Sequence, residues 1–177
     1  MSDLRVHKTK YINETKRVSF KYDGKNYFGY EGDTLASALL ANGVHLIGRS
    51  FKYHRPRGIM SCGSEEPNAI CQISDKNDLT EPNVRATELE IYDGLEAFSQ
   101  NCWPNVKFDI GGINNLISPL IPAGFYYKTF MWPKSFWKKV YEPLIRMSAG
   151  LGKSPTEPDP DIYCLLYTSD AADECLC

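Results

Sequence analysis

An Asp-Gly pair at residues 23 and 24 constrains the fold of this chain more than any other feature of its sequence. Apolar and polar residues alternate before it, from Val18 to Tyr22, and a second aromatic-rich run follows it, from Tyr27 to Tyr30. Both central residues of a type I′ turn need a positive φ, which Asp and Gly tolerate. The sequence therefore predicts a β-hairpin over about residues 17–30.

A short helix is predicted directly after this hairpin. Asp33 or Thr34 can cap its first turn, leucines and alanines recur at helical spacing from residue 35 to 41, and Gly43 suits the left-handed residue past a helix end. Further strands are predicted at Val44–Ile47, Ala69–Ile73 and Leu89–Tyr92. This order of elements predicts an α+β domain with one helix on a small mixed sheet, similar to the β-grasp fold of plant-type ferredoxins.

The stretch from Gly48 to Gly58 is a local cationic site in a chain whose net charge is only −2. Its potentially positive residues are Arg49, Lys52, His54, Arg55 and Arg57. Pro56 and Gly58 disfavour a helix, so we expect a strand end that leads into an ordered loop reaching Ala69. Arg49, Lys52, Arg55 and Arg57 are candidates for contacts to a phosphate or to a partner. The alternative is that they fix the loop and pair with Glu65 and Glu66.

Composition limits the class of protein. The 177 residues are 42% hydrophobic and 24% charged, as expected for one globular domain with an appended segment. The sequence contains no long uncharged apolar run and no signal-peptide core, so we expect no membrane insertion and a cytoplasmic location. Binding to polymeric nucleic acid is disfavoured, because it usually requires a broad basic face and this chain has a pI near 5.9.

Cysteine and histidine give no pattern typical of a metal or catalytic site. Cys62, Cys71 and Cys102 are isolated and are predicted to be reduced, without the spacing of a zinc or redox motif. His45 and His54 have no nucleophile or second acid nearby in the sequence. We therefore predict no catalytic residue and no metal ligand in this chain.

The second half of the chain is rich in aromatic residues, with eight between Phe125 and Tyr141. Such a density must be buried, either on the predicted β-grasp core or on another polypeptide. A helix is predicted to start near Pro133–Ser135, to bend at Pro143 and to end at Gly150. Residues 153–163 have the composition of a linker. The sequence from Cys164 resembles the translation of a transposase-end adapter used in DNA sequencing, so we expect residues 164–177 to carry no function.

Five ordered blocks of sequence resemble a known family. They are Glu31–Gly43, Gly48–Gly58, Glu65–Ala69, Glu81–Thr87 and Pro122–Pro133. Together they resemble the N-terminal part of the α subunit of heterotetrameric sarcosine oxidase. With this resemblance, we expect an N-terminal arm at residues 1–15, a ferredoxin-like domain at 16–95 and an aromatic-rich packing or interface segment at 96–152, before the linker and the tail.

The resemblance implies a complex that oxidises sarcosine to glycine, forms peroxide and is linked to tetrahydrofolate. The complex would use FAD, FMN, NAD and tetrahydrofolate, and its other parts would be the β, γ and δ subunits and the remainder of α. None of these cofactors is expected in this chain, which lacks a Gly-x-Gly-x-x-Gly fingerprint. Its expected role is assembly. Related complexes that oxidise other secondary amines, opines or proline remain an alternative.

The second alternative is a [2Fe-2S] electron-transfer module, because related β-grasp domains hold such clusters. A plant-type cluster needs four thiolates, three of them on one loop in the pattern C-x4-C-x2-C. Laying that pattern on Arg57-Gly58 places Ser61, Glu66 and Ala69 at ligand positions, and Cys62 is the only cysteine of the loop. We therefore expect a ferredoxin-like fold without a cluster.

Overall fold

The structure is a computed structural model that describes residues 4–5, 10–74, 80–116, 118–120, 132–149 and 152. The predicted linker (153–163) and adapter-like tail (164–177) lie outside the described residues, as do Phe125, Tyr126, Tyr127, Phe130 and Gly150. Within the described part of the chain, no helix is both long and apolar enough to cross a lipid bilayer.

The predicted hairpin is confirmed. Strand β1 (Asn13–Tyr22) pairs antiparallel with β2 (Lys25–Glu31), and the two strands meet at Tyr22 and Lys25. Asp23 and Gly24 have φ values of 47° and 73°, as a two-residue turn of this type requires. β1 begins at Asn13, within the range expected as an N-terminal arm.

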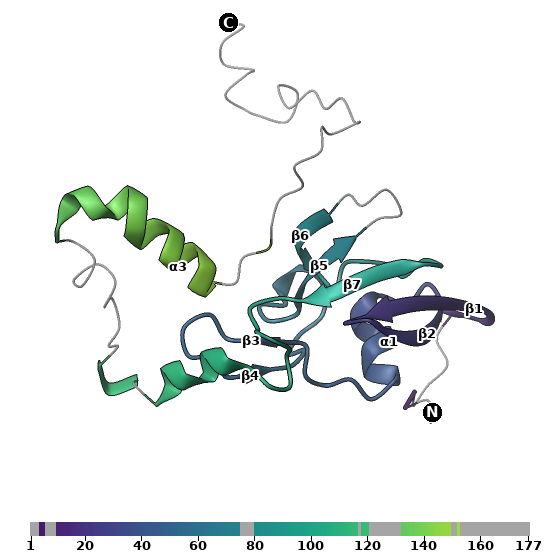
Figure 1. The fold of residues 1–177 in the computed structure, drawn as a ribbon. Coiled ribbons are helices and arrows are strands. Elements are labelled where there is room, and N and C mark those ends of the chain that lie inside the picture. Colours follow the sequence, from purple (N-terminus) through teal and green to yellow (C-terminus); the bar gives the residue numbers. More distant parts are fainter. Residues whose placement is uncertain are drawn as a thin grey trace, which may run out of the picture.

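The predicted helix is also confirmed as α1 (Leu35–Ala41). The Thr34 side chain accepts a hydrogen bond from the Ser37 amide at 3.2 Å, and Gly43 has a φ of 76° just past the helix end. Before the helix, the buried Asp33 carboxylate accepts from the Arg5 guanidinium, which ties the start of the chain to this element. Figure 1 shows α1 packed against the sheet.

The main sheet has five strands. Besides β1 and β2 it contains β5 (Ile70–Ser74), β6 (Thr80–Arg85) and β7 (Leu95–Ser99), in the order β2-β1-β7-β5-β6. β1 and β7 are parallel, with Phe20 opposite Leu95, and the other pairs are antiparallel. A mixed sheet with its first and last strands side by side and one helix on its face is the β-grasp arrangement, as predicted (Figure 1).

Two predicted strands are wrong. The last strand is β7, not Leu89–Tyr92, where Glu90 forms only an isolated bridge with Thr34. Residues 44–47 are not a strand either, because the next strand, β3, begins at Gly48. The strand at Ala69–Ile73 is confirmed as β5, whereas β6 was not predicted. β7 extends the sheet beyond the domain boundary expected at residue 95.

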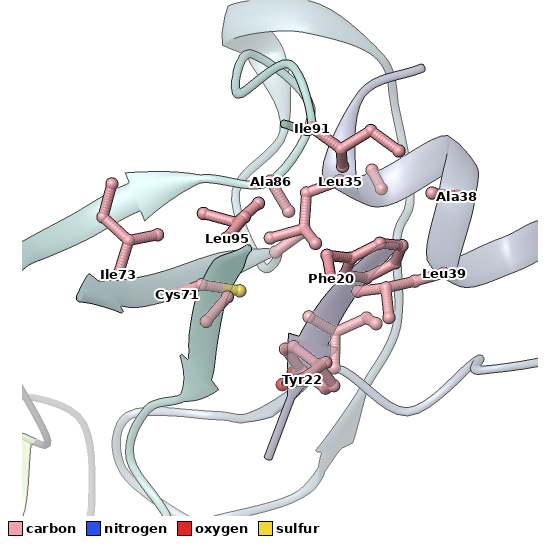
Figure 2. Close-up of a cluster of buried hydrophobic side chains, with 14 of the residues drawn as sticks. Phe20, Tyr22, Leu35, Ala38, Leu39, Cys71, Ile73, Ala86, Ile91 and Leu95 are labelled. Carbon is pink, nitrogen blue, oxygen red and sulfur yellow. Dashed lines mark hydrogen bonds between the residues drawn. The ribbon is translucent and has the colours of Figure 1, made fainter. Parts of the chain in front are cut away.

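The core lies between α1 and the sheet. Figure 2 shows its main side chains, of which Phe20, Leu35, Leu39, Cys71 and Leu95 are fully buried. Phe20 stacks with Tyr27 at 6.0 Å between ring centroids. The buried Tyr22 hydroxyl donates to the Ile47 carbonyl at 2.9 Å, so the start of the cationic stretch is attached to the core.

The remaining segments form a second sheet of two strands and several short helices. The strands are β3 (Gly48–Arg49) and β4 (Pro56–Arg57), and the 3₁₀ helices are η1 (Gly63–Glu65), η2 (Ile110–Asn115), η3 (Ser118–Leu120) and η4 (Lys134–Phe136). A π-helical turn, η5 (Trp137–Tyr141), leads into α3 (Glu142–Ala149). The helix predicted to start near Pro133–Ser135 is thus confirmed only in part, because the chain there forms 3₁₀ and π-helical turns and the α-helix begins at Glu142, next to Pro143.

Candidate functional site

The cationic stretch folds as a hairpin. Gly48 and Arg49 of β3 pair with Arg57 and Pro56 of β4. The tip is closed by a hydrogen bond from the Ser50 amide to the Arg55 carbonyl at 2.9 Å, and His54 takes a positive φ of 53°. The prediction that this stretch is not helical is confirmed.

Arg49 fastens the hairpin to the segment that follows β7. Its Nε donates to the Val106 carbonyl at 2.7 Å, and its two Nη atoms donate to the carbonyls of Lys107 at 3.0 Å and His54 at 3.2 Å. Asn101 reinforces this contact by donating from Nδ2 to the Arg49 and Ser50 carbonyls, at 3.1 and 2.9 Å. Three of the five guanidinium N–H groups of Arg49 are therefore used to hold backbone.

His54 fastens the tip of the same hairpin. Its Nδ1 lies 2.6 Å from Asp109 Oδ2, and both side chains are buried. The other carboxylate oxygen of Asp109 accepts from the Trp103 and Gly111 amides, at 3.0 and 3.1 Å. The His54 imidazole is thus a packed group whose Nδ1 is occupied by Asp109.

A pocket of about 430 Å³ lies between this hairpin, β5 and the ends of β6 and β7. Three of the four cationic candidates line it, namely Arg49, Lys52 and Arg57, whereas Arg55 does not. Arg55 instead donates from Nε to Asn115 Oδ1 at 3.1 Å and lies over the Tyr53 ring, 4.9 Å from its centroid. None of the described residues that line the pocket carries a carboxylate, so its electrostatic potential favours an anion.

The remaining wall of the pocket combines an aromatic ring with side-chain amides. Phe51, which is 62% exposed, lies on the hairpin side, and Asn68, Asn83 and Gln100 lie on the side of the sheet. Lys52 lies over the Tyr53 ring, with Nζ 4.9 Å from the centroid. The arrangement offers charge, hydrogen-bond donors and a stacking surface in one place.

The loop next to the pocket is organised by Glu66, which is only 1% exposed. Its Oε2 accepts from the Met60 and Ser61 amides at 2.7 and 2.6 Å, and its Oε1 accepts from the Asn68 and Ala69 amides at 2.7 and 3.3 Å. Burial alone would raise the pKa of Glu66, but these four backbone N–H groups outweigh it and lower the pKa.

This role of Glu66 corrects the alternative in which it pairs with the hairpin arginines, because its carboxylate accepts from backbone amides instead. Sequence reasoning also missed Asp109 and Asn101 as residues that hold the hairpin. A signal for Glu66 was available, since all of its backbone partners lie within six residues of it. None existed for Asp109, which lies 55 residues from His54.

Comparisons with known proteins bear on the fold and on the family of this chain. Residues 15–102 match the family model described as a 2Fe-2S iron-sulfur cluster binding domain. Together with the sheet order, this match defines residues 15–102 as a domain of the ferredoxin-like β-grasp class.

The particular relatives are α subunits of sarcosine oxidase. The chain is 57% identical over 163 residues to sarcosine oxidase subunit alpha of Rhizobium meliloti (strain 1021). The matched region covers 92% of this chain and 16% of that protein. It is 41% identical over 88 residues to the same subunit of Corynebacterium sp. (strain U-96), with 49% of this chain and 9% of that protein covered. The predicted resemblance is confirmed, and the chain spans less than a fifth of the length of these relatives.

The chain is also similar to a solved structure. It is the crystal structure of L-proline dehydrogenase from P. horikoshii, with 22% sequence identity and a TM-score of 0.39, and the likeness covers 53% of this chain and 17% of that chain.

The residues of the loop do not fit the cluster after which the matching family model is described. Cys62 is exposed on the loop, and Cys71 is buried in β5, where burial raises the pKa of its thiol to about 12. Cys102 lies beyond β7 beside Ser99 Oγ, at 3.4 Å. Among the described residues, no group of three or more His, Cys, Asp or Glu side chains could hold a metal ion. The loop is organised instead by the Glu66 carboxylate, which accepts from four backbone amides.

Proposed function

We propose that this chain is part of the α subunit of a heterotetrameric sarcosine oxidase and that it serves the assembly of the complex, not its chemistry. The observation that carries the proposal is the 57% identity to the Rhizobium meliloti subunit over 163 residues. The Glu66-centred loop supports a role without redox chemistry, because its donor set does not suit an iron-sulfur cluster.

In this proposal the complete complex oxidises sarcosine to glycine and forms peroxide, in the cytoplasm. FAD, FMN, NAD and tetrahydrofolate are bound by parts of the complex outside this chain. The partners are the β, γ and δ subunits and the remainder of α.

Exposed apolar side chains support the assembly role. Several large ones in the segment after β7 are each at least 49% exposed: Trp103, Phe108, Ile113, Leu116, Trp132 and Phe136. Large apolar side chains with this much exposure are enriched on surfaces that another polypeptide covers. They favour the partner interpretation of the aromatic-rich segment over packing on the β-grasp core alone.

The test replaces the matching segment of the Rhizobium meliloti α subunit with residues 17–152 of this chain and co-expresses the chimera with its partner subunits. We expect a complex that co-purifies and forms peroxide from sarcosine, and no peroxide from the isolated 177-residue chain. A second chimera, with Trp103→Asp and Phe108→Asp, should co-purify with its partners at a yield reduced by about tenfold or more.

Two results would contradict this proposal. One is peroxide formation from sarcosine by the isolated chain. The other is a chimera that is folded, as judged by its circular dichroism, but binds none of the partner subunits. Equal co-purification of the two chimeras would contradict only the assignment of the apolar surface.

A further inference from the structure

We propose that the pocket between the β3–β4 hairpin and the sheet binds the phosphate group of a small molecule that also carries a planar ring. This inference goes beyond the oxidase assignment and does not depend on it, since it concerns a binding site within the described residues of this chain.

The charge of the pocket favours a dianion. Lys52 and Arg57 line it from the tip and the second strand of the hairpin, and Arg49 adds a third positive charge at its wall. No Asp or Glu is among the described residues that line the pocket. A phosphate ester carries a charge close to −2 at neutral pH and offers several acceptor oxygens, whereas a single carboxylate would offset only one cation.

Two residues that line the pocket, Arg49 and Asn68, are held in place by hydrogen bonds to the rest of the chain. Three of the five N–H groups of Arg49 are used on backbone carbonyls, so its guanidinium is held in place by the segment after β7. The backbone N–H of Asn68 donates a hydrogen bond to Glu66 Oε1 at 2.7 Å, which positions this residue. Groups held in this way lose little freedom when a ligand binds.

The planar ring of the ligand is expected to stack on Phe51. This side chain is 62% exposed although it lies at the pocket, so its face can stack on a planar group. The volume of about 430 Å³ is within the range of small-molecule sites and exceeds what a bare phosphate would fill.

The test measures binding to the purified 177-residue chain by isothermal titration calorimetry, at fixed low salt. The probes are adenosine 5′-monophosphate, adenosine, inorganic phosphate and a peptide of alternating Asp and Glu. We expect adenosine monophosphate to bind at least about tenfold more tightly than adenosine or phosphate, because it alone engages both the cations and the ring.

Variants then locate the site. Changing both Lys52→Gln and Arg57→Gln should weaken adenosine monophosphate binding by at least about tenfold. The matched control is Lys25→Gln with Lys107→Gln, which removes the same charge from a different pocket of about 510 Å³ and should change the affinity less than about twofold. Phe51→Ala should weaken adenosine monophosphate but leave phosphate unchanged. Circular dichroism checks that each variant is folded.

Four results would overturn the inference. Equal affinity for adenosine monophosphate and phosphate would indicate an adventitious ion only. Tighter binding of the acidic peptide would indicate a protein partner in place of a small molecule. Equal losses in the two double variants would show a general charge effect, and the absence of measurable binding would exclude the site. None of these results bears on whether the chimeric complex oxidises sarcosine.

Discussion

Glu66 shows how a single residue can define a loop. A carboxylate that accepts four backbone amides satisfies donors from both ends of the turn between residues 60 and 69. The side chain is almost fully buried, so the loop depends on its charged form. Neutralising this one group should therefore loosen the whole turn.

Replacing Glu66 by Gln should lower the free energy of unfolding by roughly 2 kcal/mol, because hydrogen bonds to a charged group contribute about 1.5–3 kcal/mol. The Gln NH₂ group would also face backbone donors. Urea denaturation followed by circular dichroism measures the change, and Glu65→Gln on the exposed neighbour is the matched control, with an expected effect within about 0.5 kcal/mol. Equal effects of the two substitutions would contradict the role assigned to Glu66.

The same residue sets an expected pH dependence. The pKa of Glu66 is lower in the folded chain than its ordinary value of 4.5, so the unfolded chain binds the proton more readily. The stabilisation is complete above about pH 4.5 and is lost as the pH falls through the lower folded-state value. Between pH 5 and pH 3 the urea midpoint should therefore fall more steeply for the natural chain than for Glu66→Gln. Parallel curves would contradict this prediction.

At the scale of single residues, the sequence identified the type of group but not its partner. Arg49 was recognised as a loop-fixing or ligand-binding cation, yet the carbonyls that it holds lie at Val106 and Lys107. His54 was predicted not to be catalytic, and its actual partner, Asp109, is equally remote in sequence. Partners at such separations are set by tertiary packing and leave no local pattern.

Among the elements, the docking of η2 on the β3–β4 hairpin is the contact that a small change should break. A Cβ placed on Gly111 would lie 2.2 Å from His54 Nδ1, whereas one on Gly112 would meet nothing within 4 Å. The two glycines are neighbours in the same 3₁₀ helix, but only Gly111 lies against the His54 ring.

Gly111→Ala should therefore lower the free energy of unfolding by about 1–3 kcal/mol, since the His54 ring must move away from Asp109. Gly112→Ala should change it by less than about 0.5 kcal/mol. Thermal unfolding measures stability, and faster amide hydrogen exchange at Trp103 and Gly111 would report the loss of the contact locally. The same small effect in both variants would show that the hairpin does not depend on this docking.

Elements defined by short-range sequence patterns could be predicted from the sequence. Strands whose position depends on pairing with residues far away in the sequence could not. The hairpin at Asp23-Gly24 and the helix capped by Thr34 follow from short-range chemistry. β6 contains Pro82 and charged residues, which is compatible with its place at the edge of the sheet but weakens its pattern as a strand. β7 has Leu95 and Ala97 buried in alternation, but its central place comes from parallel pairing with β1.

For the whole molecule, we expect that this chain has a ferredoxin-like fold but binds no [2Fe-2S] cluster. Incubating the reduced, purified chain with ferrous iron and sulfide under anaerobic conditions should give no visible absorption typical of a [2Fe-2S] centre and far less than two iron atoms per chain, because the loop offers one thiol. A plant-type ferredoxin treated in parallel is the positive control. Stable binding of two irons with such a spectrum would refute this interpretation of the loop.

The parallel pairing of β1 with β7 has a consequence for how the chain is made. Ribosomes release β1 and β2 early in translation, but the strand that joins them to β5 and β6 is the last of the sheet. Until Ser99 has left the exit tunnel, the nascent chain holds two separate hairpins with the apolar face of α1 only partly covered. Slower synthesis before Ser99 leaves the tunnel would prolong exposure of this face, so the need of the nascent chain for chaperones should rise as that stage of synthesis slows.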